Sequence, residues 1–361
     1  MIPDRGITDN FNGKRKIAWK GKSMKAVIVG CGNIAMVHAE CLEQISGCEI
    51  VGFADVIIEK AEKMAARFGG NAYASLEEAL ACERPDVLHI CTPHYLHVPM
   101  AVYGLEQGVH VFMEKPPAIS KRQWTELKNA ANNSEKKLGF CFQNRYNGSL
   151  KFVKELIGSG EAGKVLGARG LVTWNRNDKY YTESAWRGKL ETEGGGALIN
   201  QSIHTMDLLG EFLGKPVKIE ATTANHHLKG LIEVEDTMEA YISYENANAC
   251  FYVTTAYCDD APPLIEVVCE NVKVRIEEPE VTIFYGDGRI ERKRFDHRKV
   301  LGKNYWGSGH LACIEDFYTC LREDIRFAQD MDGVEATVKL MLAAYDSAEK
   351  GGEQWIWKEA F

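Results

Sequence analysis

The sequence predicts an α/β protein in two parts, a doubly wound parallel sheet followed by an α+β domain with an open, mostly antiparallel sheet. Short apolar runs alternate with amphipathic stretches from residue 25 to about 146, and period-two alternation dominates afterwards. The chain of 361 residues, 45% of them hydrophobic, is long enough to bury two cores. We therefore expect an extension over 1–23, a first domain over 24–146 and a second domain over 147–361.

The first domain has the rhythm of consecutive strand–helix–strand units. We expect strands at 26–29, 49–54, 87–91, 109–113 and 138–142, with helices at 34–45, 58–68, 75–82 and 120–132. Ser75 and Glu78 form a capping-box pattern at the start of one helix, because a hydroxyl oxygen there can accept a free backbone N–H. Five or six parallel strands result.

The second domain is rich in strands. Alternation of apolar and polar residues predicts strands at 217–224, 237–244, 249–257 and 264–268. Helices are expected at 150–158, 197–212, 310–322 and 334–349. Few helices between long alternating runs indicate an open sheet, with antiparallel neighbours in most positions.

Charge and composition exclude several classes of partner. The net charge of −8 and the pI near 5.8 provide no general basic field for nucleic acid. No run of about 18 apolar residues exists, so we expect no membrane span. Residues 1–23 are polar and basic without the apolar stretch of a secretory signal. We interpret them as a disordered arm or as an extension upstream of a start at Met24, and we expect a cytoplasmic protein.

The cysteines indicate reduced thiols rather than disulfides or a metal centre. The 11 cysteines are scattered singly through apolar segments, as at Cys91, Cys141 and Cys250, without a CxxC pair or metal-ligand spacing. We expect buried, reduced thiols and no metal.

A glycine-rich segment lies between the first strand and the first helix. Gly30, Gly32 and the helix-starting residues Asn33, Ile34 and Ala35 form GxGxxA. The first glycine permits the tight turn, the second lets a pyrophosphate approach the backbone, and the alanine allows close packing of helix and strand. The helix N-terminus offers free N–H groups to the phosphates. This pattern predicts a dinucleotide site of the Rossmann type.

Asp55 ends the next strand, about 20 residues past the glycines, where a carboxylate can accept hydrogen bonds from ribose hydroxyls. The residues that follow, 56–58, contain no Arg or Lys to neutralise a 2′-phosphate. We therefore expect NAD as the cofactor, in preference to NADP.

The strand 109–113 runs directly into Glu114, Lys115 and Pro116. Ligands of a doubly wound sheet bind at the carboxyl ends of its strands, so Lys115 is expected beside the nicotinamide. A lone lysine is usually a solvated surface group, but this position favours a functional role.

With these motifs the sequence resembles the glucose-fructose oxidoreductase, inositol dehydrogenase and rhizopine catabolism family (Gfo/Idh/MocA) from residue 24 to about 357. The resemblance rests on GxGxxA, on Glu114-Lys115-Pro116, on the segment 92–97 and on the segment 194–207, which contains a triple glycine. It implies that Lys115 orients substrate and cofactor and that His204 accepts the substrate proton. The family often has Asp four residues before this histidine, whereas this chain has Asn200, which can hold a hydroxyl but cannot take its proton.

The resemblance also implies the lining of the two ligand pockets. The cofactor pocket would include the residues that follow two strands, Thr92, Pro93, His94, His97 and Glu114. A zinc pair at His94 and His97 is conceivable, but no carboxylate or Cys completes the spacing. The substrate pocket would include Asn200, His204 and Arg145, and the aromatic and hydrogen-bonding residues of the next stretch add Tyr180, Trp186 and Arg187.

The stretch 174–187 combines aromatic faces, among them Trp174 and Tyr181, with hydrogen-bonding groups such as Asn175 and Asn177. Sugars need both, so we expect a carbohydrate or polyol substrate that is oxidised at a secondary ring hydroxyl. An ordinary polar loop pinned by aromatic residues is the plainer interpretation of the stretch.

Two further functions stay open: an NAD-dependent glycosidase that oxidises, eliminates and reduces again, and a non-catalytic nucleotide-sensing protein of the same fold. The resemblance also implies a homodimer or homotetramer that pairs through the second sheet.

Overall fold

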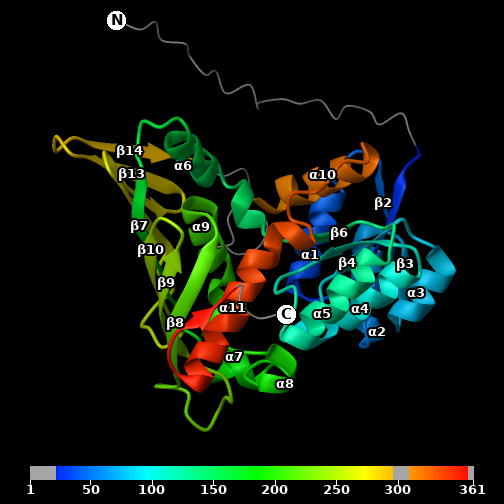
Figure 1. The fold of residues 1–361 in the computed structure, drawn as a ribbon. Helices are drawn as coiled ribbons and strands as arrows, with labels where there is room; N and C mark the ends of the chain where they lie inside the picture. Colours follow the sequence, from blue (N-terminus) through cyan, green and yellow to red (C-terminus); the bar gives the residue numbers. More distant parts are fainter. Residues whose placement is uncertain (1–21, 296–308, 357–361) are drawn as a thin grey trace, which may run out of the picture.

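The computed structural model describes residues 22–295 and 309–356, and it places two sheets side by side with helices around and between them (Figure 1). The expectation for residues 1–23 lies outside the described residues except at 22 and 23. The two-part α/β architecture that the sequence predicts is confirmed.

The first sheet has six parallel strands in the order β3-β2-β1-β4-β5-β6. Its strands are β1 (Met24–Val29), β2 (Cys48–Ala54), β3 (Asn71–Tyr73), β4 (Val87–Ile90), β5 (His110–Met113) and β6 (Leu138–Phe140). Strands β4 and β6 are buried at every position, as expected for a sheet with helices on both faces. The strand order reverses between β1 and β4, which is where a doubly wound sheet binds its ligand.

The helices of this sheet are α1 (Asn33–Leu42), α2 (Ile58–Phe68), α3 (Leu76–Glu83), α4 (His94–Glu106) and α5 (Lys121–Asn132). The predicted cap of α3 is confirmed, because Ser75 Oγ accepts the backbone N–H of Glu78 at 3.2 Å. Helix α4 was not predicted. It contains Pro99 and is apolar around most of its surface, so it lacks the amphipathic pattern of the other helices.

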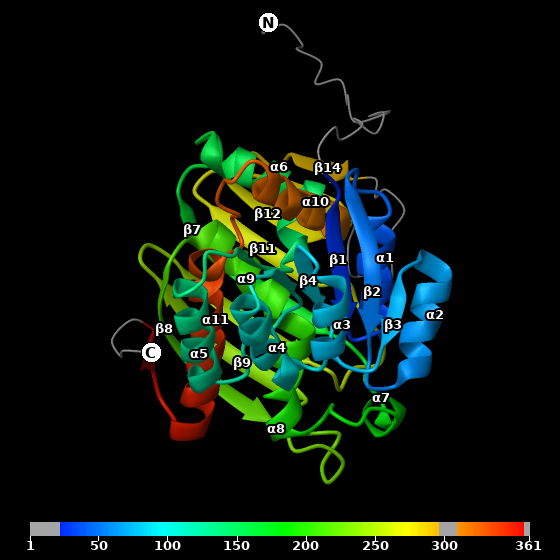
Figure 2. The same ribbon diagram turned by 90° about the vertical axis from the view of Figure 1, so that its right-hand side faces the viewer.

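The second sheet has nine strands in the order β14-β13-β12-β11-β7-β10-β9-β8-β15 (Figure 2). They are β7 (Val165–Thr173), β8 (Pro216–Ala224), β9 (Thr237–Tyr244), β10 (Asn248–Thr254), β11 (Leu264–Cys269), β12 (Val272–Glu277), β13 (Glu280–Tyr285), β14 (Ile290–Arg294) and β15 (Gln354–Trp355). Strands β7 and β10 pair in parallel and the other described pairs are antiparallel, as the alternation pattern predicts.

Between and after these strands lie η1 (Gln143–Tyr146), α6 (Gly148–Gly158), α7 (Asp178–Thr182), α8 (Leu190–Glu193), η2 (Ala197–Ser202), α9 (Ile203–Leu213), α10 (Gly309–Arg322) and α11 (Met331–Lys350). Helix α9 packs on β7 and α11 on β8, so both cover the face of the second sheet that looks toward the first (Figure 1). The single helix expected at 197–212 begins instead as a π-helical turn, η2, and continues as α9.

Helix α10 returns to the first sheet. It packs on α1 and η1, and its buried residues Ile314, Phe317 and Tyr318 share one hydrophobic core with Ile28 of β1 and Phe112 of β5. A segment that lies after the boundary expected at residue 146 therefore completes the core of the first sheet. The domain ranges themselves stay a prediction.

All 11 cysteines lie in the described residues, and none is paired. Cys91 and Cys141 are buried as expected, but Cys250 is exposed, because alternate residues of β10 face away from the core. The expectation of a buried thiol is wrong there. Within the described ranges, no helix is both long and apolar enough to cross a lipid bilayer.

Candidate active site

The glycine segment forms an open cradle at the start of α1. Gly30 has φ of +84°, and a Cβ built on it would lie 2.7 Å from the carbonyl carbon of Cys91, so only glycine fits this turn. A Cβ on Gly32 would meet no atom within 4 Å. Gly32 is also the N-cap of α1 and provides no side-chain cap, so the first N–H groups of the helix face this space. An uncapped helix end beside an open glycine fits the pyrophosphate of a dinucleotide.

Asp55 lies beside this cradle as expected, but its carboxylate already has protein partners. Its Oδ2 accepts the backbone N–H of Cys31 and its Oδ1 that of Ile57, each at 2.8 Å. Asp55 therefore ties the glycine turn to the end of β2, and each oxygen keeps a lone pair for a ribose hydroxyl. Val56, the residue after Asp55, is 88% exposed. Lys60 is the cation that follows Asp55 most closely in the sequence. It lies near enough to Cys31 to counteract the burial that raises the pKa of this thiol to about 12.

Lys115 connects the carboxyl end of β5 with the segment η2. It follows β5, and its Nζ donates a 2.7 Å hydrogen bond to the backbone oxygen of Asn200 in η2. Burial lowers the pKa of Lys115, and the nearby carboxylates of Glu114 and Glu193 counteract this lowering. The structure thus brings a residue of the first sheet into contact with the segment that carries His204.

Glu114 ends a buried chain of hydrogen bonds. Tyr318 Oη lies 3.0 Å from His89 Nε2, His89 Nδ1 lies 2.9 Å from His38 Nδ1, and His38 Nε2 lies 3.0 Å from Glu114 Oε1. Burial opposes ionisation of Glu114, but the hydrogen bond from His38 outweighs it and holds the pKa of this carboxyl below its usual range.

An ionised Glu114 can only accept, and this sets every proton of the chain. His38 must donate from Nε2, so its Nδ1 accepts from the Nδ1–H of His89, whose Nε2 then accepts from the hydroxyl of Tyr318. All donors point toward Glu114. Sequence reasoning assigned a role to Glu114 alone, because His38 and His89 lie in a helix and a strand without a motif around them.

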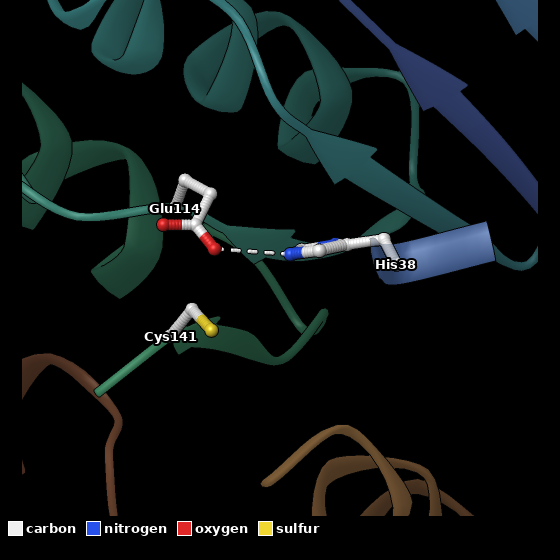
Figure 3. A group of neighbouring side chains, drawn as sticks. All are labelled: His38, Glu114 and Cys141. Carbon is white, nitrogen blue, oxygen red and sulfur yellow. Dashed lines mark hydrogen bonds and ion pairs between the residues drawn. The ribbon is translucent and has the colours of Figure 1, made fainter. Parts of the chain in front are cut away.

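In the described part of the chain, His38, Glu114 and Cys141 are the one group whose ligand atoms could surround a metal ion, and these atoms lie within 4.8 Å of one another (Figure 3). The carboxylate and the imidazole are joined by a hydrogen bond in Figure 3. The thiol of Cys141 donates to Gln143 Oε1, with the sulfur 3.8 Å from the oxygen. We interpret the group as a carboxylate hydrogen-bonded to an imidazole beside a buried thiol, because each of its polar atoms has a protein partner.

His204 lies in the first turn of α9 and faces Lys115. The amide Nε2 of Gln143 lies 3.4 Å from His204 Nε2, which places the lone pair on Nε2 and the ring hydrogen on Nδ1. Nδ1 is buried and has no partner among the described residues. Burial, followed by the charge of Lys115, lowers the pKa of His204 to about 3. The imidazole is therefore neutral, which is the form that a general base needs.

Asn200 presents only one polar atom to the crevice. Its Nδ2 donates to Glu193 Oε1 at 2.5 Å and to the hydroxyl of Tyr180 at 3.3 Å. The amide oxygen is therefore the atom left for a substrate, and it can accept a hydroxyl hydrogen. Asn200 lies in the π-helical turn η2, a feature that is frequent at functional sites.

Glu193 was missed by the sequence reasoning. It is 1% exposed, and its carboxylate accepts from Asn200 and from the backbone N–H of Gly188. Burial is the main cause that raises the pKa of Glu193 to about 7, against the lowering effect of these two bonds. The available signal was the position of Glu193 directly before the triple glycine. Those glycines alone are explained by the end of α8, where Gly194 is the C-cap, so they do not draw attention to Glu193.

The two histidines after β4 contact backbone rather than open space. His97 has Pro116 O and Thr92 O each 2.9 Å from a ring nitrogen, and His94 Nδ1 donates to the backbone oxygen of Glu193 at 2.8 Å. Burial lowers the pKa of both. The bond to Pro116 fixes the turn after β4 against the turn after β5, and the bond from His94 ties the start of α4 to Glu193 of α8. In the turn after β4, the hydroxyl oxygen of Thr92 is buried without a partner among the described residues.

The residues expected to bind substrate divide into two groups. Tyr180 and Trp186 lie around Asn200 and His94, and Arg187 lies over both aromatic rings. Arg145, in contrast, forms a bidentate ion pair with Asp207 at 2.5 and 2.8 Å. Its guanidinium is committed to α9, so its place in the substrate pocket does not follow from the geometry.

Other aromatic residues of the stretch 174–187 are structural. Trp174 is buried and donates from Nε1 to Ala261 O at 2.9 Å. Tyr181 is buried in a small cluster with Leu228 and Ile232. The plainer interpretation, a loop pinned by aromatic residues, is correct for this part of the stretch.

Comparison with known proteins agrees with this geometry. Residues 24–142 match the oxidoreductase family with an NAD-binding Rossmann fold, GFO_IDH_MocA, and residues 150–275 match the GFO/IDH/MocA C-terminal domain. The chain is 25% identical to D-glucoside 3-dehydrogenase of Escherichia coli, over 93% of this chain and 98% of that protein.

Solved structures share the architecture. The WlbA dehydrogenase from Bordetella pertussis, crystallised with NADH and UDP-GlcNAcA, is 28% identical with a TM-score of 0.80, over 92% of this chain and 98% of that one. Levoglucosan dehydrogenase in complex with NADH and levoglucosan is 18% identical and shows the same fold, with a TM-score of 0.84 over 93% of this chain and 100% of that one. This protein is therefore an NAD-dependent dehydrogenase of the Gfo/Idh/MocA family.

Proposed function

We propose that the enzyme oxidises a secondary ring hydroxyl of a sugar or sugar derivative. One observation carries this proposal: Lys115, which follows β5 of the first sheet, reaches the segment of Asn200 and His204 through the 2.7 Å bond between Lys115 Nζ and Asn200 O. Support also comes from the relative that acts on D-glucosides, which is similar over nearly the whole chain.

Each of the three residues has a separate task. Lys115 provides positive charge where an alkoxide develops, and the neutral imidazole of His204 is the group that accepts the hydroxyl proton. The amide oxygen of Asn200 accepts a hydrogen bond from a hydroxyl and so orients the ring. Bound NAD supplies the acceptor for the hydride. Tyr180 and Trp186 offer aromatic faces to the apolar side of a ring.

The cofactor would be held by the cradle described above. Gly30 and Gly32 leave room for the pyrophosphate at the N-terminus of α1, followed by Asn33 and Ile34. Asp55 would receive the adenosine ribose. The turns after β4 and β5, with Thr92, Pro93, His94, His97, Glu114 and Lys115, would surround the nicotinamide side.

The test is turnover of a panel of glycosides, uronosides, inositols and nucleotide sugars with NAD, followed by NMR of the product to locate the ketone. We expect Lys115→Ala and His204→Ala to lower kcat/KM by at least about a hundredfold with NAD affinity nearly unchanged, and Asn200→Ala to cost less. Near-wild-type turnover of His204→Ala would exclude it as the base. Release of an aglycone without net NADH would favour the glycosidase over the dehydrogenase reaction.

Self-association through the second sheet also belongs to this proposal. Tyr241 and Val268 are 49% and 38% exposed on its outer face, opposite the face that α9 covers. Light scattering on the purified protein measures the number of subunits, and a monomer would contradict the proposal.

A further inference from the structure

Three arginines lie in or near the stretch expected to bind substrate, and the structure separates them. Arg145 is paired with Asp207 and, at 3.1 Å, with Glu211. Arg176 is paired with Asp260 at 2.8 Å. Among residues 22–295 and 309–356, no carboxylate forms an ion pair with Arg187. Arg187 is therefore the one of the three whose charge is available to a ligand.

Aromatic packing orients Arg187. Its guanidinium carbon lies 4.3 Å from the centre of the Tyr180 ring and 5.1 Å from that of Trp186. Its Nε is buried without a hydrogen-bond partner among the described atoms. A guanidinium stacked in this way has a restricted plane, and its terminal N–H groups are left to donate along one edge. This is the geometry that binds a planar carboxylate through two parallel hydrogen bonds.

Charged groups of both signs lie around Arg187, which acts electrostatically on Lys115, on His94 and on Glu193. The geometry connects them, because Tyr180, on whose ring Arg187 packs, accepts from Asn200, and the backbone oxygen of Asn200 accepts from Lys115. Both oxygens of Glu193 are occupied by Gly188 and Asn200. Lys115 has the carboxylates of Glu114 and Glu193 near it, whereas Arg187 has no ion-pair partner among the described residues.

We propose that Arg187 binds a carboxylate carried by the sugar ring that the enzyme oxidises, so that the substrate class is uronic acids and their glycosides. The inference rests on the proposed function, since it names the substrate of the same crevice. A planar carboxylate on the ring itself fits the guanidinium better than a remote phosphate, because Arg187 packs on Tyr180, whose hydroxyl accepts from the residue, Asn200, that contacts Lys115.

The test compares matched pairs of substrates. Methyl glycosides and methyl uronosides of glucose, galactose and mannose, together with the three sugar 6-phosphates, are assayed with NAD on the wild type, Arg187→Gln and Arg187→Lys. We expect the wild type to prefer the uronoside, and Arg187→Gln to lower kcat/KM for it by about 30-fold to 100-fold, a loss at least about tenfold larger than the loss on the neutral glycoside. Arg187→Lys should recover part of the loss, because it retains the charge without the planar fork.

Binding is measured separately from turnover, by the thermal shift of the NADH complex with free glucuronate, with glucose as the neutral control. Stabilisation by glucuronate that Arg187→Gln abolishes would support the inference even if no sugar were oxidised, in which case the proposed function alone would fail. A wild type that prefers the neutral sugar in every pair, or that prefers the 6-phosphates, would overturn the inference. So would equal losses on charged and neutral substrates in a folded Arg187→Gln protein.

Discussion

The protonation of Glu193 should control the acid side of the pH profile. An ionised Glu193 accepts from Nδ2 of Asn200, which leaves the amide oxygen of Asn200 for the substrate hydroxyl. A protonated Glu193 has a hydroxyl to donate, and Asn200 can accept it only by turning its amide. The oxygen is then withdrawn from the substrate. Activity therefore requires the ionised form.

The magnitude follows from the pKa of Glu193, which burial raises to about 7. Because the pKa is raised, the proton is bound below pH 7 and lost above it. One titrating group lowers the active fraction about tenfold per pH unit below its pKa, and so about a hundredfold at pH 5. His204 does not titrate in this window, since its pKa is lowered to about 3.

The assay is kcat/KM for the sugar between pH 5 and 9 at saturating NAD, with Glu193→Gln as the test. The glutamine resembles the protonated carboxyl, so we expect a flat acid side at the low activity of the wild type at pH 5. Glu191→Gln, on the exposed side of the same helix, is the matched control and should retain the wild-type profile. An unchanged acid limb in Glu193→Gln would refute the reasoning, as would a wild type without a limb near pH 7.

Three other predictions follow from the cofactor cradle and from the buried ion pair between Arg145 and Asp207. NAD should bind at least about tenfold more tightly than NADP, because a 2′-phosphate would approach the carboxylate of Asp55, and Asp55→Ser should narrow this gap in fluorescence titrations. Gly30→Ala should weaken NAD binding and lower the melting temperature. Gly32→Ala should weaken NAD binding alone, because a Cβ at residue 32 would occupy only the open cradle. A Gly30→Ala protein with the melting temperature of the wild type would contradict this. Arg145→Met should cost about 3–5 kcal/mol in urea unfolding, because it leaves Asp207 buried without its partner, and a loss below about 1 kcal/mol would count against it.

The sequence predicted most of the fold where local pattern and tertiary environment agree. Five strands of the first sheet are short apolar runs, the helices α2 and α5 carry clear periodicity, and Ser75 caps α3 as its position suggests. Strands β3, β7 and β12 to β15 were missed; of these, β12 to β14 alternate but follow one another through short turns. Helix α4 was missed because its exposed side carries Tyr95 and Pro99, so it lacks the charged face that identifies a helix.

The candidate site was predictable only as far as motifs extend. Lys115 and Asn200 were expected near each other, but their bond runs to a backbone oxygen that no residue type specifies. A histidine known only from its sequence is expected to titrate near pH 6.5, whereas burial lowers the pKa of His204 to about 3. Arg145 and Arg187 look alike in sequence, and only their contacts show that one is paired and the other is not. Chemistry that depends on burial and on contacts between distant segments has no local signal.

The contact of Tyr318 with His89 makes the first sheet dependent on the last quarter of the chain. Helix α10 fills the core of that sheet with Ile314 and Phe317, and its tyrosine is the outermost donor of the buried histidine chain. A fragment that stopped at residue 146 would expose this apolar surface and leave His89 Nε2 without a donor. The nucleotide-binding half is therefore not an autonomous folding unit. The enzyme should unfold in one cooperative transition, and ribosomal synthesis has to pass residue 322 before the cofactor sheet can reach its final packing.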